Sequence, residues 1–258
     1  MAEEGYTHYP AKYFSASPTF FAWNALTCAD VHTLLQTRPG FEGQNLYFVR
    51  NHPVRYVRLV GLVVGIELIA NGKYLLLCLD DGSGATIECK VEVRKPKIEA
   101  KVDEQWPSNT FVDNLNVIAD MGLAAVSVDG TDVEVGTVVK AKGTVESFRD
   151  VRQLKLERIF VVKDTNAEVK AWKEATAWKA EKFAKPWVLT EREIGDLEKK
   201  LQVEKVQEME GAKKRRARDA KHAEKRRRHE EKKERKRRVV EGEFDSGALA
   251  KSAVLPDR

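Results

Sequence analysis

The chain has 258 residues, of which 42% are hydrophobic and 33% are charged, enough for one domain with a sizeable core and a further segment that is not globular. The formal net charge of +5 hides an asymmetry, because residues 213–238 hold 16 Lys and Arg against 5 Asp and Glu, and the rest sums to −6. The longest apolar stretch, Leu59 to Ala70, carries Glu67 and two glycines. Composition therefore excludes a membrane span, and we expect a soluble intracellular protein without a signal peptide.

The first 50 residues predict an N-terminal extension rich in aromatic side chains. Its aromatic residues before position 24 are Tyr6, Tyr9, Tyr13, Phe14, Phe20, Phe21 and Trp23. We expect them to pack on the outside of the following domain, and an exposed platform for bases is the alternative. Thr27, with Asp30 three residues later, predicts the cap of a short helix over residues 29–37.

Three consecutive strands are predicted after the extension. Their expected bounds are Val54–Ile69, Lys73–Leu79 and Ala85–Val93. Gly61 and Gly65 predict a bulge or bend within the long first strand. Asn71-Gly72 favours a hairpin turn, because both residues accept positive φ angles.

Two more strands are expected, Thr137–Phe148 and Gln153–Val162, joined by a turn over Arg149–Arg152. Residues 106–130, between the third and fourth strands, have a helical appearance. The order β-β-β-α-β-β is that of the OB-fold, a five-stranded barrel that binds single-stranded nucleic acid or oligosaccharide. The predicted fold is mainly β with helices, the OB-fold occupying residues 51–188, and a generic small barrel or sandwich is the alternative.

The chain resembles the Stn-type subunit of the fungal CST telomere-capping complex, a relative of the middle subunit of replication protein A. The resemblance lies in NHPVRYVRLVGLVV…YLLLCLDDGSG…IECKV, VKAKGTVESFRDVRQLKLERI and DTNAEVKAW, and upstream in YPAKYFSASPTFFAWNALTCADVHTL. It implies a nuclear protein of the telomeric region whose partners are a small Ten-type OB-fold subunit, single-stranded telomeric DNA and a larger CST subunit. Many Stn-type proteins carry paired winged-helix domains after the OB-fold, which do not fit the last 70 or so residues here.

OB-folds bind single strands across the second and third strands, by stacking bases on aromatic rings and pairing phosphates with cations. The candidate nucleic-acid-binding residues are Lys73, Tyr74, Lys90, Lys142, Phe148, Arg149 and Arg152. Phe148 leads, because the resemblance places it in a G-x-h-x-S-F motif where the replication subunit stacks an aromatic on DNA; a plug of the barrel end is the alternative. Lys140, Lys142 and Phe148 share strand parity and hence one face. Val91 and Glu146 replace a tryptophan and a basic residue of relatives, which favours weak intrinsic binding.

A helix is expected over residues 167–185 with two apolar stripes, too many for one barrel end to cover. The first stripe is Val169, Trp172, Thr176, Ala180 and Phe183, and the second is Ala171, Ala175 and Trp178. The resemblance implies that one face pairs with the Ten subunit. The candidate partner-binding residues are Val169, Trp172, Thr176, Trp178 and Phe183. Use of both faces internally, or in a homodimer, is the alternative.

The segment from 189 to 240 predicts a charged helical tail that starts at a capping box, Thr190 to Glu193, and residues 241–258 are expected to be disordered. Its first half fits a short coiled coil or a partner segment. Its second half suits nuclear import and non-specific phosphate contact, or mere solubilisation. The candidate nuclear-localisation residues are Lys213, Lys214, Arg215, Arg216, Arg226, Arg227 and Arg228.

Nothing in the sequence favours catalysis. Cys28, Cys78 and Cys89 lack the spacing of a zinc site and are expected to be buried thiols. Asp80 and Asp81 are adjacent in a turn, where their carboxylates diverge, so we expect a structural role. We therefore expect no enzyme, no metal and no cofactor. Three functions remain: telomere-end capping with a Ten-type partner, general single-strand binding of the replication protein A type, or a protein-interaction scaffold without intrinsic DNA binding.

Overall fold

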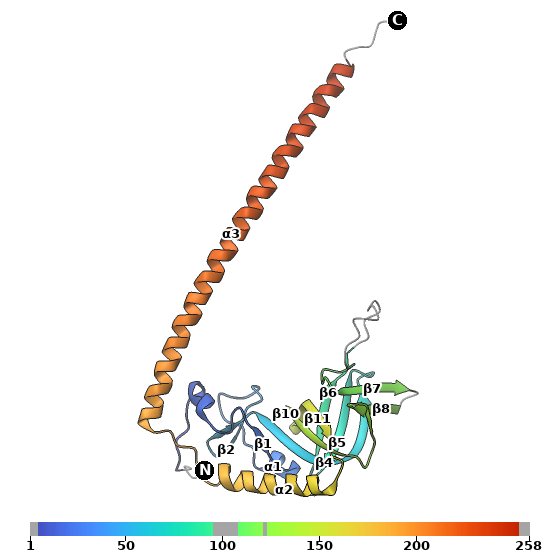
Figure 1. The fold of residues 1–258 in the computed structure, drawn as a ribbon, viewed down its shortest axis with the longest axis vertical. Coiled ribbons are helices and arrows are strands. Elements are labelled where there is room, and N and C mark those ends of the chain that lie inside the picture. Colours follow the sequence, from blue (N-terminus) through green and yellow to red (C-terminus); the bar gives the residue numbers. More distant parts are fainter. Residues whose placement is uncertain (1–4, 95–107, 121–122, 253–258) are drawn as a thin grey trace. The chain divides into compact units, whose positions relative to one another are not determined.

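The computed structural model describes residues 5–94, 108–120 and 123–252, and its contacts divide the chain into two units, Met1–Leu189 and Thr190–Arg258 (Figure 1). Each unit is described by itself. None of the helices in the described ranges combines the length and the apolar character that a membrane span needs.

Five strands form the centre of the first unit. They are β4 (Tyr56–Ile69), β5 (Tyr74–Asp80), β6 (Thr86–Glu92), β10 (Val138–Phe148) and β11 (Val151–Val161). Antiparallel pairings join β4 to β5, β5 to β6, β4 to β10 and β10 to β11, and a parallel pairing joins β11 to β6. The succession of pairings thus returns to β4, which is the strand order of an OB-fold and confirms the predicted fold class. A short strand, β1 (Trp23–Ala25), adds to β4 in parallel.

Alternating apolar residues explain why these segments are strands. Leu75, Leu77 and Leu79 are fully buried on one face of β5, while their neighbours in sequence are partly exposed. The predicted bulge in β4 is found between Val63 and Gly65. The hairpin after β4 has positive φ at residues 70, 71 and 72, as expected.

The turn between β10 and β11 is tighter than predicted. Arg149 and Asp150 alone connect the strands, with φ angles of 50° and 64°, so β11 begins at Val151 and not at Gln153. Such a two-residue turn matches the twist of the paired strands. Within the same hairpin, a Cβ atom at Gly143 would overlap the carbonyl oxygen of Lys155, so the close approach of β10 and β11 requires glycine there.

The helix expected between the third and fourth strands is absent from the described part of that segment. A small sheet takes its place, formed by β7 (Leu115–Asp120), β8 (Leu123–Val128) and β9 (Thr131–Val133). Leu115 and Val117 are buried while Ile118 is 67% exposed. Burial thus alternates with the two-residue period of a strand and not with the period of a helix. Residues 106–107 and 121–122 of the expected helix lie outside the described residues.

The N-terminal extension contains η1 (Ala11–Ala16), α1 (Cys28–Thr33) and β2 (Tyr47–Val49), which forms a hairpin with β3 (His52–Val54) just after it. Phe14 is buried, and its ring centre lies 5.5–5.8 Å from those of Phe20, Phe41 and Phe48. The predicted cap of α1 is confirmed, but the helix ends at Thr33 and not at residue 37.

Two helices follow the strands. α2 (Thr165–Trp178) is capped by Asp164, whose Oδ1 accepts a hydrogen bond from the Ala167 N–H at 2.7 Å, and it continues through a π-helical turn, η3 (Lys179–Phe183). In the second unit, α3 (Glu191–Ser252) starts at the predicted capping box of Thr190 and Glu193. The disorder expected from residue 241 is wrong for residues 241–252, which are helical and contain no proline. Residues 253–258 lie outside the described residues.

Candidate functional site

One outer surface of the OB-fold gathers aromatic and charged side chains from four strands. The Nζ atoms of Lys73 and Lys90 each lie 5.0 Å from the centre of the Tyr74 ring. Lys90 also lies 3.6 Å from the carboxylate of Glu146, which Lys155 approaches to 3.8 Å from β11. Lys155 was not among the predicted nucleic-acid-binding residues, because its position opposite Lys90 depends on the parallel register between β11 and β6.

Phe148 lies at the end of this surface, with the same strand parity as Glu146. Its side chain is 55% exposed and the Arg149 guanidinium is 5.2 Å from its ring centre. This exposure contradicts the alternative of a plug in the barrel. We name the surface formed by Lys73, Tyr74, Lys90, Glu146, Phe148, Arg149 and Lys155 the OB face.

Arg152 does not belong to the OB face. Its Nη1 donates hydrogen bonds of 2.6 Å to the carbonyl oxygens of Val31 and His32, and its guanidinium lies 5.4 Å from the Tyr47 ring. Burial lowers the pKa of Arg152, and the nearby Tyr47 partly offsets this. Arg152 therefore fastens the end of α1 to the strands, and its prediction as a nucleic-acid contact is wrong.

Lys142 also lies apart from Phe148, although both side chains point outward from β10 as predicted. Six residues of a strand span roughly 20 Å. The Nζ atom of Lys142 lies 5.5 Å from the Trp23 ring and 5.7 Å from the Phe160 ring. Burial, followed by the charge of Lys140 and of two arginines, lowers the pKa of Lys142. Shared parity placed the two residues on one face without making them neighbours.

The two faces of α2 divide the predicted partner residues. Phe183 is buried and its ring centre lies 5.6 Å from that of His52, while the indole Nε1 of Trp178 donates to Asn24 Oδ1 at 3.3 Å. Both therefore pack on their own domain, which corrects their assignment as partner contacts. The wide π-turn adds a residue to the last turn and rotates Phe183 out of the stripe predicted for a regular helix.

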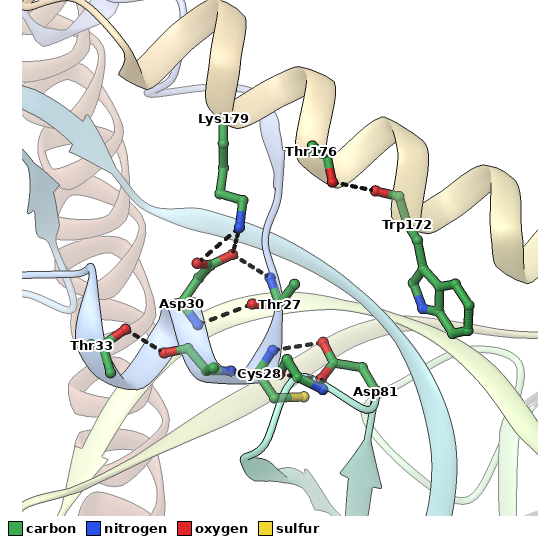
Figure 2. Close-up of polar contacts among 10 residues, drawn as sticks. Thr27, Cys28, Asp30, Thr33, Asp81, Trp172, Thr176 and Lys179 are labelled. Atoms are coloured by element: carbon green, nitrogen blue, oxygen red, sulfur yellow. Dashed lines mark hydrogen bonds and ion pairs between the residues drawn. The ribbon is translucent and has the colours of Figure 1, made fainter.

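A flank of α2 beside the buried Ala175 is only partly covered. Trp172 is 46% exposed, Val169 is 36% exposed, and the exposed Thr176 hydroxyl donates to the Trp172 carbonyl oxygen at 3.1 Å (Figure 2). We name Val169, Trp172 and Thr176 the partner face. Trp172 points from α2 toward the turn that holds Asp81 and lines a hollow with Thr27 and Asp81, so the described part of this chain covers the indole only in part (Figure 2).

Two ion pairs fix α2 and the π-helical turn after it to the rest of the domain. Lys179 Nζ lies 2.8 Å from Asp30 Oδ2 on α1 (Figure 2), and Arg58 on β4 pairs with Glu174 at the same distance. α1 is itself held by the turn after β5, because the Cys28 N–H donates to Asp81 Oδ2 at 2.8 Å. The carboxylate of Asp81 thus has the structural role that was predicted.

The three cysteines and the predicted nuclear-localisation residues lie outside the OB face and the partner face. Cys28 and Cys89 are buried free thiols whose pKa values are raised by burial, and Cys78 is a free, partly buried thiol. Among the residues that the structure describes, no three His, Cys, Asp or Glu side chains could hold a metal ion together. The predicted nuclear-localisation residues 213–216 and 226–228 are exposed along α3.

Comparisons with known proteins agree with this architecture. Residues 1–100 and 114–236 match the family model described as telomere regulation protein Stn1. The CST complex subunit STN1 of Ailuropoda melanoleuca is 24% identical over 158 residues, covering 60% of this chain and 40% of that protein. The corresponding subunit of Danio rerio is 24% identical over 168 residues, covering 60% and 41%. The chain thus matches about two fifths of the length of these relatives.

A solved structure of yeast Stn1 and Ten1 is similar over 75% of this chain and 91% of the matched chain, with a TM-score of 0.52 and 20% identity. At this identity, the similarity shows a shared fold. Because the family model matches most of the sequence, the chain belongs to the Stn1 family of telomere regulation proteins.

Proposed function

We propose that this protein takes part in capping and maintaining telomere ends in the nucleus, as a binding subunit and not as an enzyme. It pairs with a small Ten1-type OB-fold subunit through the partner face, and it contacts single-stranded telomeric DNA through the OB face. A larger subunit of the CST complex is a further partner. The observation that carries the proposal is the half-exposed Trp172 on the flank of a helix that packs on its own domain through Ala175.

The partner face has the properties of a protein interface. Tryptophan is enriched among the residues that dominate binding energy, and Val169 extends the apolar surface by one helical turn. The ion pairs Asp30–Lys179 and Arg58–Glu174 fix the helix before any partner arrives. Such preorganisation reduces the entropy lost on association. The solved yeast structure, which contains Stn1 and Ten1, supports this choice of partner.

Co-expression of the full chain with the Ten1-type subunit of the same organism tests the partner face. Trp172→Ala should weaken the complex at least about 30-fold, as expected for a central tryptophan. Phe21→Ala is the matched control, because Phe21 is 64% exposed and lies outside α2. A Trp172→Ala complex as stable as the wild type in size-exclusion chromatography would rule out this face.

The OB face supports weak binding of single-stranded DNA. Tyr74 and Phe148 offer rings for stacking, and Lys73, Lys90 and Arg149 supply positive charge beside them. Glu146 neutralises part of that charge through its ion pairs with Lys90 and Lys155. We therefore expect tight binding only when the partner subunit extends the surface.

The same Glu146 favours a second candidate function, a protein-interaction scaffold whose OB-fold contacts no DNA. In that case any DNA binding would come from the charge of α3 alone and would vanish as the salt concentration rises. Stacking on the OB face would instead persist at moderate salt and would depend on Phe148.

A further inference from the structure

The charges of α3 are distributed unevenly around the helix axis between residues 213 and 238. At about 100° per residue, one stripe carries only cations, and we name it the basic face. It consists of Lys214, Arg218, Lys221, Lys225, Lys232 and Lys236. Of the 16 Lys and Arg in these residues, 11 lie in the half of the helix that contains this stripe, and so do His222 and His229.

All five acidic residues of this stretch lie in the opposite half. They are Asp219, Glu224, Glu230, Glu231 and Glu234, and five cations balance them there. One half of the helix is thus close to neutral, while the other has a formal charge of about +11. A tail that only solubilises the protein needs no such separation of charge.

In the described part of α3, no residue of the basic face takes part in an ion pair. The pairs between residues 213 and 238 are Arg227–Glu231 at 3.4 Å, Arg228–Glu224 at 2.7 Å and Arg238–Glu234 at 3.0 Å. In the described part of α3, no acid pairs with Lys214, Lys225 or Lys232, which project into solvent. The acids stabilise the helix from the other side without compensating the charge of this face.

We propose that the basic face of α3 binds double-stranded DNA, with the helix lying along the major groove and its cations on the flanking phosphates. An α-helix is roughly 10–12 Å wide and fits the major groove of B-form DNA, which is about 12 Å wide. The stretch spans roughly 39 Å, long enough for contacts with many phosphates. No base-specific side chain is required for this contact, so it is independent of sequence.

Other polyanions fit the basic face less well. Residues 213–238 contain no Phe, Tyr or Trp ring on which an unpaired base could stack, so single strands gain little beyond charge. The major groove of duplex RNA is too deep and narrow for a helix. A membrane surface would need an apolar stripe, whereas the side of α3 opposite the basic face is acidic and basic in equal numbers.

This contact goes beyond the proposed function, because it concerns duplex DNA and a different unit of the chain. The test uses the full chain and a 20-base-pair duplex of arbitrary sequence, with binding followed by fluorescence anisotropy over a series of salt concentrations. Lys214→Gln, Lys225→Gln and Lys232→Gln together remove three charges from the basic face. Lys213→Gln, Arg216→Gln and Arg227→Gln remove three charges from the opposite half and form the matched control.

We expect the first triple variant to bind the duplex at least about 10-fold more weakly, with a salt slope reduced by roughly 2.7, and the control to change affinity less than about threefold. Glutamine is a good helix former, and circular dichroism verifies equal helicity. Equal losses in both variants would show that only net charge matters and would overturn the proposal. So would equally tight binding of duplex RNA or of a single strand of the same length.

A second variant separates helix from charge. Ala223→Pro breaks α3 without altering any charged residue, and Ala223 lies in the half opposite the basic face. The duplex should bind this variant several-fold more weakly than the wild type. Unchanged affinity would mean that a flexible basic chain is sufficient, and the proposed helical contact would then be wrong.

Discussion

Phe148 and Phe111 have nearly the same local surroundings but different places in the fold. Phe148 is 55% exposed beside Arg149, and Phe111 is 59% exposed with the Arg94 guanidinium 4.9 Å from its ring centre. Phe148→Ala should cost about 1–3 kcal/mol in binding single-stranded telomeric DNA, which corresponds to one stacked base, and Phe111→Ala should cost nothing. Anisotropy titrations of the complex with the partner subunit measure both. Equal affinity for both variants would favour the scaffold function.

Asp30 connects the cap of α1 to α2. Burial would raise the pKa of Asp30, but hydrogen bonds from Lys179 and Thr27 outweigh it and lower this pKa below its usual value. The ionised form therefore stabilises the fold above the pKa of the unfolded chain, and this contribution is lost as the pH falls through the lowered folded-state pKa. Asp30→Asn should reduce the free energy of unfolding by about 1–2 kcal/mol at pH 7.

Urea unfolding followed by tryptophan fluorescence tests this prediction, because all five tryptophans precede residue 190 and report on the first unit. The difference between Asp30→Asn and the wild type should shrink as the pH falls below about 4. The control is Asp132→Asn, at an exposed position of β9, which should match the wild type throughout. A constant difference across pH would mean that the carboxylate acts by shape and not by charge.

At the scale of elements, the features that were predicted correctly are those that neighbouring residues in the sequence determine. The five OB strands, the bulge at Gly65 and the caps at Thr27 and Thr190 are each determined by residues within a few positions of one another. The segment after residue 108 was mistaken for a helix, because a short apolar run fits both periods until burial separates Val117 from Ile118.

The candidate sites depended more on tertiary structure. Periodicity identified two stripes on α2, but only packing shows which one faces the domain, and the π-turn moves Phe183 between them. Arg152 and Phe148 both looked available in sequence, yet carbonyl groups of α1, over a hundred residues away, bind Arg152. Lys155 became part of the OB face through a parallel pairing that no local motif encodes.

At the scale of the whole molecule, the boundary between the two units falls after Leu189. The residues just before it are fixed to the first part of the chain: the Trp187 N–H donates to Asn51 Oδ1, and the Leu189 N–H donates to Tyr9 Oη, both at 2.8 Å. Trp187 is also buried against Tyr9, with ring centres 4.8 Å apart. The first unit therefore needs its chain up to Leu189 and nothing in α3 for its internal contacts.

A chain ending at Leu189 should accordingly unfold at the same urea concentration as the full protein when tryptophan fluorescence is followed, since the contacts of Trp187 and Leu189 are kept. A chain ending at Lys185 loses those contacts and should unfold at a lower urea concentration. Its free energy of unfolding should fall by about 2–4 kcal/mol, because it lacks a buried tryptophan.

The chain ending at Leu189 should keep the Phe148-dependent binding of single strands and lose duplex binding. Duplex binding that survives the removal of α3 would place that contact in the first unit, where the cations around Lys142 would be the next residues to change.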